Sequence, residues 1–276
     1  MTRIPIFMAS DDKYVGMAAT AMASVCSNTD SEIAFCFLDC GLSVRNKKML
    51  QMTAEKLPNS TLEIIPVDLS RFAHVRLRNY VTIAGFARLL IPELKPELEK
   101  IIYLDCDTIT LKDIRELYVK DLSGKALGAV PDWHAIEDGE SKHMRYSGAK
   151  LSDTHAYFNS GVMLINPKQW AADEMFDKCI EAESETANTR MFNDQDVLNK
   201  AFDSNFTHLD KRFNVKSNLV DDFDSNDIVV RHFTSFIKPN LHLGFTQKNA
   251  DDFWFYANMT PFYAEMFMQA FIEPMV

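Results

Sequence analysis

The 276-residue sequence lacks any apolar run close to the roughly 20 residues that a membrane-spanning helix needs. Its first residues, MTRIPIFMASDDKY, have no long apolar stretch after Arg3, so we expect no signal peptide. Basic residues are also scarce, because 29 Lys and Arg stand against 39 Asp and Glu, for a net charge of −10. Nucleic-acid binders and membrane-surface binders need basic patches, and the charge balance argues against both classes.

Cysteine is scarce as well. The five cysteines are an odd number without the spacing of a metal site, so we expect a reduced, cytoplasmic protein. A G-x-G-x-x-G loop is missing after the first predicted strand, which disfavours a nicotinamide dinucleotide site. With 47 % hydrophobic residues and no repeat, linker or low-complexity tract, the chain is expected to form a single folded domain.

Short apolar runs alternate with helical patterns along the chain. In the first part, strands are predicted at 4–9, 33–38 and 62–67, with helices at 14–25 and 44–57. This βαβαβ order predicts a mostly parallel, doubly wound α/β sheet flanked by helices. Further on, the predicted segments are helical residues at 84–90, strands at 103–108, 126–130, 161–166 and 228–233, and helices at 167–183, 193–202 and 251–271. The polar segment 137–153 is interpreted as a mobile loop that could form a lid.

Two aspartates stand one residue apart at the end of an apolar run, in YLDCDT (Tyr103–Thr108). If they lie on a strand, Asp105 and Asp107 point to the same face, beyond the carboxyl end of the sheet. Such close carboxylates repel each other unless one is protonated or a cation lies between them. Mg²⁺ or Mn²⁺ suits these oxygen ligands and commonly accompanies a phosphate. The alternative is a pair of solvated turn aspartates, because D-x-D is short and common.

A histidine and a lysine support the cation hypothesis. His232 follows the strand-like run DIVVR, and Lys238 comes six residues later. An imidazole would complete the metal's ligands and favour Mn²⁺ over Mg²⁺, and the lysine could meet a phosphate oxygen as a point charge. Taken singly, His232 is more typical of a buried structural histidine and Lys238 of a surface lysine, so the hypothesis depends on their combination.

Six motifs follow one another along residues 6–240: ASDDKY, FARLLIPEL, YLDCDT, FNSGVMLIN, NDQDVLN and HFTSFIKP. Their order and spacing resemble those of family 8 glycosyltransferases, retaining enzymes with the GT-A fold that include bacterial lipopolysaccharide glucosyl- and galactosyltransferases. The resemblance implies a GT-A catalytic domain at 1–245, with a helical tail at 246–276 packing on it. It also implies transfer of a hexose, glucose or galactose, from a UDP-sugar to a saccharide or glycolipid acceptor.

The resemblance further implies which residues act. The ligands of Mn²⁺, with Mg²⁺ as the alternative, would be Asp105, Asp107 and His232. The nucleotide would be bound by Ala9, Asp11, Tyr14 and Lys238, with Tyr14 against the uracil ring. The donor sugar, whose hydroxyls need carboxylate and amide partners, would be bound by Arg88, Asp132, Asn159, Asp194 and Gln195. Each has a structural alternative, such as a surface position for Arg88 and helix capping for Asp11 and Asp194.

The resemblance implies that the sugar keeps its anomeric configuration, and a double displacement would need a nucleophile on the sugar face opposite UDP. Gln195 matches the position opposite the leaving group but is a poor nucleophile, and Asp194 is the carboxylate alternative. We therefore favour front-face attack, in which the acceptor hydroxyl enters on the side that UDP leaves. The sequence departs from the family pattern at Ser235, where glycine is usual, and at Asn240, where tryptophan is common.

The C-terminal segment, DDFWFYANMTPFYAEMFMQAFIEP, is aromatic and acidic. Because anionic lipids repel acidic segments, packing on the core or on a second copy of the chain is favoured over membrane contact. The protein is thus expected in the cytoplasm, with peripheral association at the inner membrane as the alternative.

Two rival functions stay open on the sequence. In a haloacid-dehalogenase-type phosphatase, Asp105 would be the nucleophile and Asp107 the acid/base. The position of the pair far from the N-terminus, and Ile109 in place of Thr or Val, count against it. The other rival is a nucleotide-sugar-binding protein without turnover.

Overall fold

The computed structural model describes residues 3–75, 77, 83–132, 136–137, 140–141, 151, 156–190, 192–217, 222–234, 238–240 and 250–272. The chain divides into two compact units. The first unit comprises Met1–Pro66, Leu104–Val119 and Arg212–Val276, and the second comprises Val67–Tyr103 and Lys120–Lys211. The boundary predicted between a catalytic domain, 1–245, and a tail, 246–276, stays a prediction. The helices of that tail belong to the first unit.

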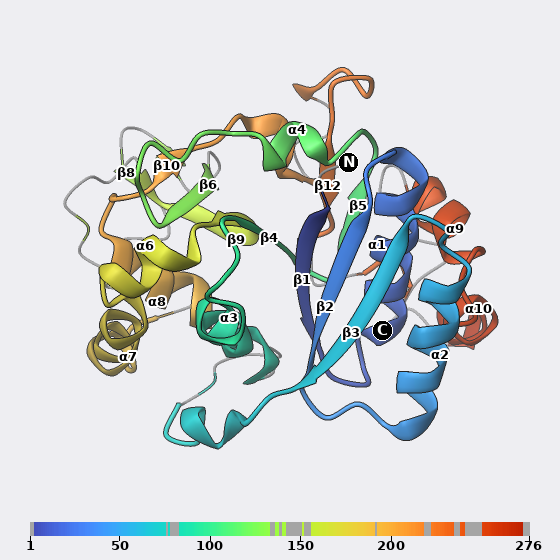
Figure 1. Cartoon of the computed structure of the whole chain (residues 1–276), viewed down its shortest axis with the longest axis horizontal. Helices are drawn as coiled ribbons and strands as arrows, with labels where there is room; N and C mark the ends of the chain where they lie inside the picture. The colour runs from blue at the N-terminus through green and yellow to red at the C-terminus, as the bar shows by residue number, and fades with distance from the viewer. Residues whose placement is uncertain are drawn as a thin grey trace. The chain divides into compact units, whose positions relative to one another are not determined.

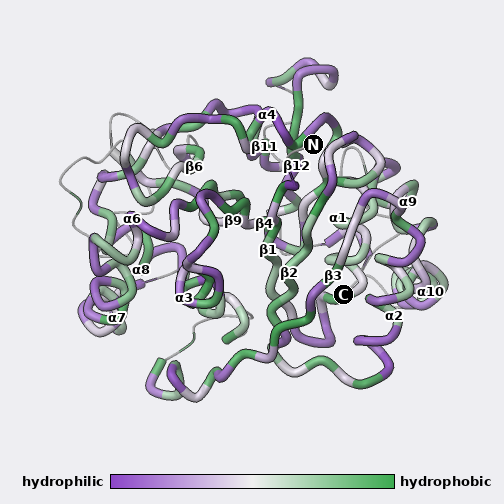
Figure 2. Tube along the Cα trace, in the orientation of Figure 1, coloured by the Kyte–Doolittle hydropathy of each residue, from purple (hydrophilic) through white to green (hydrophobic). Residues whose placement is uncertain are grey.

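In the first unit, three parallel strands follow the predicted βαβαβ order (Figure 1). They are β1 (Ile4–Ser10), β2 (Ile33–Asp39) and β3 (Ser60–Pro66), linked by α1 (Val15–Asn28) and α2 (Val44–Glu55). All seven residues of β1 are buried, as expected for a parallel strand covered on both faces. Figure 2 shows β1 and β2 as largely hydrophobic and α2 as largely hydrophilic.

The helical tail predicted over 251–271 consists of two helices, α9 (Ala250–Ala257) and α10 (Tyr263–Ile272). Pro261 lies in the turn between them, where its missing N–H interrupts no helix. The tail packs on α1, where Gly16 permits close approach, because a Cβ there would lie 2.8 Å from Met266 Sδ. Arg231 Nη1, only 2.7 Å from Asp252 Oδ2, anchors the start of α9.

A second, small sheet in the first unit has the order β11-β12-β5. Its strands are β5 (Thr108–Thr110), β11 (Val215–Lys216) and β12 (Val230–His232). β12 runs antiparallel to β5, with His232 opposite Thr108, and parallel to β11. This register brings the histidine beside the residues that precede β5. The short helix α4 (Arg115–Tyr118) also belongs to this unit.

The second unit contains the strand order β10-β6-β9-β4. These strands are β10 (Thr207–His208), β6 (Leu127–Pro131), β9 (Phe158–Ile165) and β4 (Ile101–Leu104), whose last residue belongs to the first unit. β6 is parallel to β10 and antiparallel to β9, with a shift in register between Ala129 and Val130. The protein thus has an α/β fold with mixed, mostly parallel strand pairing, as predicted.

The described helices of the second unit are joined to its strands in part by an aromatic cluster of Phe158, Trp170, Phe202 and Phe206. They are η1 (Leu69–Phe72), the 3-10 helix η2 (Ile83–Leu90), α3 (Ile91–Leu94), α6 (Pro167–Ala172), α7 (Met175–Thr186) and α8 (Asn193–Phe202). The single helix predicted at 167–183 was wrong. It is broken at Glu174, whose φ of 53° lies in the left-handed region.

Three smaller features complete the described chain: β7 (Ile136–Glu137), β8 (Glu140–Ser141) and η5 (Lys211–Phe213). β7 and β8 pair in antiparallel fashion. The loop predicted at 137–153 falls mostly outside the described residues, and so does Ser235.

Candidate functional site

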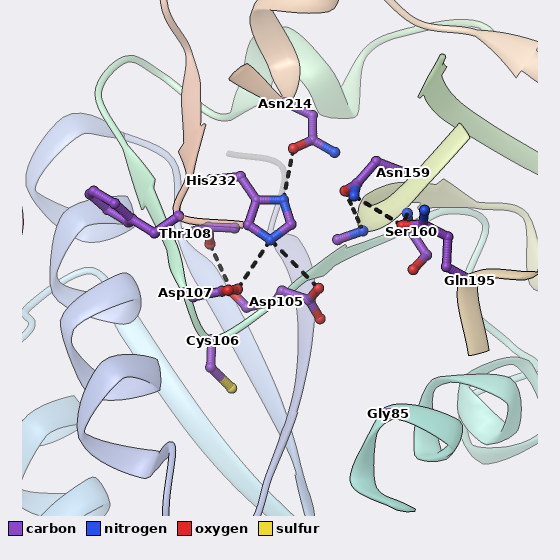
Figure 3. Close-up of polar contacts among 12 residues, drawn as sticks. Gly85, Asp105, Cys106, Asp107, Thr108, Asn159, Ser160, Gln195, Asn214 and His232 are labelled. Atoms are coloured by element: carbon purple, nitrogen blue, oxygen red, sulfur yellow. Dashed lines mark hydrogen bonds and ion pairs between the residues drawn. The ribbon is translucent and has the colours of Figure 1, made fainter. Parts of the chain in front are cut away.

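Asp105 and Asp107 lie in the turn between β4 and β5, so their placement on a strand was wrong. Strand β4 ends at Leu104, one residue before Asp105. In the turn that follows, Thr108 Oγ1 donates to the Asp105 carbonyl at 2.8 Å. The two carboxylates still converge, as the strand argument predicted. Cys106 between them is buried and donates from Sγ to the Ala9 carbonyl at 3.2 Å, away from the carboxylates (Figure 3).

His232 completes a three-residue cluster in the first unit. Its Nε2 lies 3.1 Å from Asp107 Oδ1 and 3.8 Å from Asp105 Oδ2. One ligand atom from each of the three residues lies within 4.8 Å of the others. Opposite ligands of one octahedral ion, each at about 2.1 Å, are about 4.2 Å apart. The separations of 3.1 and 3.8 Å between His232 Nε2 and the two carboxylates lie within this limit. The cluster therefore offers oxygen and nitrogen donors at a spacing that suits a single divalent cation.

Lys238 adds positive charge to this cluster. Its Nζ donates to Asp107 Oδ2 and to the Phe233 carbonyl, both at 2.6 Å. Burial by itself raises the pKa of the Asp107 carboxyl, but Lys238, and His232 when protonated, outweigh that effect and hold the pKa well below its ordinary value. Asp107 is therefore an ionised carboxylate at neutral pH, which is the form that ligates a metal.

Asn214 is a contact that the sequence did not reveal. Its Oδ1 lies 3.0 Å from His232 Nδ1, on the side of the ring away from the aspartates (Figure 3). It precedes β11 and is 18 residues from the histidine in sequence. No motif marks an asparagine before a two-residue strand, so only the pairing of β11 with β12 identifies it.

A second cluster lies in the second unit around Arg88, which is buried on η2. Arg88 Nε lies 3.2 Å from Asp194 Oδ2, and Nη1 donates to the carbonyl and hydroxyl oxygens of Ser160 at 2.8 and 3.1 Å. The guanidinium also lies 4.5 Å from the centre of the Tyr103 ring. The alternative of a surface arginine is therefore wrong. The sequence missed Ser160 and Tyr103, which nothing in their motifs distinguishes from core residues.

Gln195 on α8 is held by hydrogen bonds at both ends of its amide. Its Oε1 accepts from Asn159 Nδ2 at 2.9 Å and from the Ser160 amide at 3.2 Å, and its Nε2 donates to Tyr157 Oη at 3.1 Å. Tyr157 in turn donates to Asp196 Oδ1 at 2.5 Å. Burial, and then the carboxylate of Asp196, raise the pKa of Tyr157 far above its ordinary value, so its hydroxyl stays protonated.

Asp132, the remaining sugar candidate, is buried directly after β6, and its amide donates to the Tyr157 carbonyl at 2.7 Å. The structure therefore brings the five predicted sugar-binding residues into one unit. Tyr157, which contacts both Gln195 and Asp132, and Asp196, which accepts from the Tyr157 hydroxyl, were not predicted as site residues. Asp196 stands inside NDQDVLN, but nothing in the motif indicated that its carboxylate faces a buried tyrosine.

The predicted nucleotide-binding residues Ala9, Asp11 and Tyr14 lie at the end of β1 and before α1, in the first unit. Asp11 Oδ1 accepts from the Lys13 amide at 3.0 Å, which closes a turn. Tyr14 occupies the N-cap of α1 without a side-chain cap, so helix capping by Asp11 was wrong. The Lys13 ammonium lies 5.3 Å from the centre of the half-buried Tyr14 ring.

Comparison with known proteins identifies the family of the chain that carries these two clusters. Residues 5–241 match the model of Glycosyl transferase family 8. The chain belongs to this family. General stress protein A of Bacillus subtilis (strain 168) is 29 % identical over 221 residues, which are 78 % of this chain and 74 % of that protein. A lipopolysaccharide 1,2-glucosyltransferase of Escherichia coli is 23 % identical over 91 % of this chain and 77 % of its own length.

Solved structures agree with the family match. This family 8 glycosyltransferase is similar to the galactosyltransferase LgtC in complex with donor and acceptor sugar analogues, with a TM-score of 0.79 and 27 % identity over 94 % of this chain and 96 % of LgtC. The fold is thus that of the GT-A enzyme LgtC, as the motifs implied. Some relatives are longer, and the chain spans 57 % of the glycosyltransferase GlyF of Streptococcus pneumoniae.

Family membership favours the transferase over the phosphatase alternative. Within the part of the chain that the structure describes, no helix is long and apolar enough to cross a bilayer.

Proposed function

We propose that this family 8 glycosyltransferase moves glucose or galactose from UDP to a saccharide or glycolipid acceptor in an Mn²⁺-dependent reaction. The observation that carries the proposal is the convergence of Asp105, Asp107 and His232 from distant parts of the sequence. The matches to a lipopolysaccharide glucosyltransferase and to the galactosyltransferase LgtC support these two hexoses. The match to the lipopolysaccharide glucosyltransferase also supports a role in lipopolysaccharide synthesis. We expect that role in the cytoplasm or at the inner membrane surface.

The three ligands favour Mn²⁺, with Mg²⁺ as the alternative, because an imidazole nitrogen joins two carboxylates. The ion, when bound, supplies Lewis-acid stabilisation of the diphosphate leaving group. Lys238, whose ammonium lies at Asp107, adds a further positive charge for a phosphate oxygen.

We assign the nucleotide and the sugar to groups of residues in different parts of the chain. Ala9, Asp11 and Tyr14 would bind uridine, with the Tyr14 ring against uracil. The cluster around Arg88 would bind the hexose, because neighbouring sugar hydroxyls pair with carboxylate and amide groups. That cluster comprises Arg88, Asp132, Asn159, Asp194 and Gln195.

The hydrogen bonds of the second cluster support front-face attack. The oxygen of Gln195 already accepts two hydrogen bonds, and the Asp194 carboxylate faces the Arg88 guanidinium, so both are weak nucleophiles. In the proposed step, the bond from the anomeric carbon to the UDP oxygen breaks and a bond to the acceptor oxygen forms on the same face. A phosphate oxygen of the departing UDP takes the acceptor's proton, and configuration is retained.

The test is a thermal-shift screen of UDP-glucose and UDP-galactose with Mn²⁺ or with EDTA. A ligand that binds only the folded state raises the melting temperature, and we expect this rise to need both the UDP-sugar and the metal. Metal-dependent release of UDP would show turnover, and loss of that release in Asp107→Asn is the matched control. Phosphate release from monoesters without dependence on UDP-sugars would instead favour the phosphatase. A glycosyl adduct trapped on Asp194 or Gln195 would contradict front-face attack.

The C-terminal tail carries exposed apolar side chains, Phe255, Phe267, Met268 and Phe271. Association of two copies through this segment is part of the proposal. Light scattering of the full chain beside a Phe271→Ser variant tests it, and a monomeric full chain would exclude it.

A further inference from the structure

The two ring nitrogens of His232 have different partners. Nε2 faces the carboxylates of Asp105 and Asp107, whereas Nδ1 lies 3.0 Å from Asn214 Oδ1 (Figure 3). An amide oxygen can only accept a hydrogen bond, so Nδ1 must carry the proton of this contact. In the neutral ring, Nε2 then holds the lone pair that a metal requires.

We propose that Asn214 is a positioning residue for the metal site, which fixes both the tautomer and the orientation of the His232 ring. The inference rests on the proposed metal-dependent function and extends it to a residue that makes no contact with the metal itself. Ligating histidines in metalloproteins commonly donate their second ring N–H to a carbonyl or carboxylate oxygen, which holds the ring and makes it a better ligand.

The surroundings of Asn214 suit this role. It is 4 % exposed and stands between Phe213 and Val215, both fully buried. The parallel pairing of β11 with β12 places Val215 opposite Arg231 and Lys216 opposite His232. The amide is therefore anchored to the same small sheet as the histidine, and water has little access to replace its oxygen.

Without this acceptor, the ring loses its fixed tautomer. In the other tautomer, Nε2 carries the proton and donates it to Asp107, which lies 3.1 Å away. That proton would take up the Nε2 lone pair that a metal would need. Removing the Asn214 oxygen therefore lowers metal affinity even though all three ligands remain.

The experiment measures Mn²⁺ binding to the full chain by isothermal titration calorimetry in the presence of UDP. Asn214→Leu keeps the side-chain volume but removes the acceptor, and we expect its Mn²⁺ affinity to fall roughly 10- to 100-fold. Asn214→Asp keeps an oxygen that accepts from Nδ1–H, and we expect it to retain the wild-type affinity. If Asn214→Leu does not fold, Asn214→Ala takes its place with the same expectation.

Asn59→Leu is the matched control. Asn59 is a half-buried asparagine of the same unit, and its Nδ2 donates to the Thr29 carbonyl at 2.7 Å. We expect Asn59→Leu to lower thermal stability and leave Mn²⁺ affinity unchanged. A general loss of packing would weaken metal binding in both leucine variants.

The outcomes separate this inference from the proposed function. Wild-type affinity in Asn214→Leu, or an Asn214→Asp affinity as low as that of Asn214→Leu, overturns the positioning role and leaves the metal site intact. Absence of Mn²⁺ binding to the wild-type protein with UDP overturns both proposals.

Discussion

The ion pair of Arg88 and Asp194 is expected to contribute strongly to the stability of the second unit. The two side chains are 7 % and 9 % exposed, and Arg88 Nε lies 3.2 Å from Asp194 Oδ2. Arg88→Met keeps most of the aliphatic volume but removes the guanidinium that lies against the buried Asp194 carboxylate. Removing one partner of a buried ion pair costs about 3–5 kcal/mol, and we expect this loss in the free energy of unfolding.

A double-mutant cycle separates the pair from the packing of the arginine. Asp194→Asn removes the charge that faces the Arg88 guanidinium, so the double variant should lose less stability than the sum of the single variants. We expect a coupling energy of about 2–3 kcal/mol, near the upper end for residues in contact. Urea unfolding followed by tryptophan fluorescence measures all four proteins, and Trp170, buried in the same unit, reports on it.

The exposed pair of Arg71 and Glu93, also in the second unit, provides the control. Its Arg71 Nη1 to Glu93 Oε2 distance is 2.8 Å, but the side chains are 40 % and 45 % exposed. Arg71→Met should therefore cost at most about 1 kcal/mol. Additive losses in the Arg88 and Asp194 cycle, with coupling below about 0.5 kcal/mol, would refute the assignment of a desolvated ion pair.

Three further changes test other parts of the molecule. Asp105→Asn should abolish the stabilisation that Mn²⁺ gives in the presence of UDP, about 2.7 kcal/mol at 100 times the Kd, and an unchanged melting-temperature rise would contradict its role as a ligand. Gly128→Ala should cost about 1–3 kcal/mol in urea unfolding, because the new Cβ would lie 2.7 Å from the buried Leu122 Cδ2; a neutral result would mean that the leucine moves freely. The pKa of Asp39 is lowered because hydrogen bonds from Lys47 and the backbone outweigh burial, so Lys47→Met should reduce stability at pH 7. The stability lost in Lys47→Met should shrink as the pH falls below about 4. A carboxyl with a lowered pKa stabilises the fold above its unfolded pKa of about 3.9, and this contribution is lost when the carboxyl is protonated. Equal losses of stability at pH 7 and pH 3 would contradict the role of the Asp39 carboxylate.

Local patterns predicted the regular elements of the first unit well. The runs that became β1, β2 and β3, and the helices between them, were located from hydrophobic period and length. The predictions were less accurate where a single residue changes the backbone. Glu174 adopts a left-handed conformation that divides the helix expected at 167–183, and no propensity of glutamate indicates this.

The candidate site was predictable as a set of residue types and unpredictable as a set of contacts. Motif order identified Asp105, Asp107 and His232, but the placement of the aspartates on a strand was wrong because β4 ends at Leu104. Their convergence with the histidine depends on the antiparallel register that sets His232 opposite Thr108.

The sequence by itself determined the order of the strands and helices, the acidic balance of charge and the motifs of a family 8 glycosyltransferase. These features depend on neighbouring residues, whose spacing along the chain is fixed by covalent geometry. Tertiary structure alone decided that Asn214 meets the His232 ring and that Arg88 is buried against Asp194. Such contacts join residues 18 and 106 positions apart, and they form only when strand register and helix packing bring those side chains together.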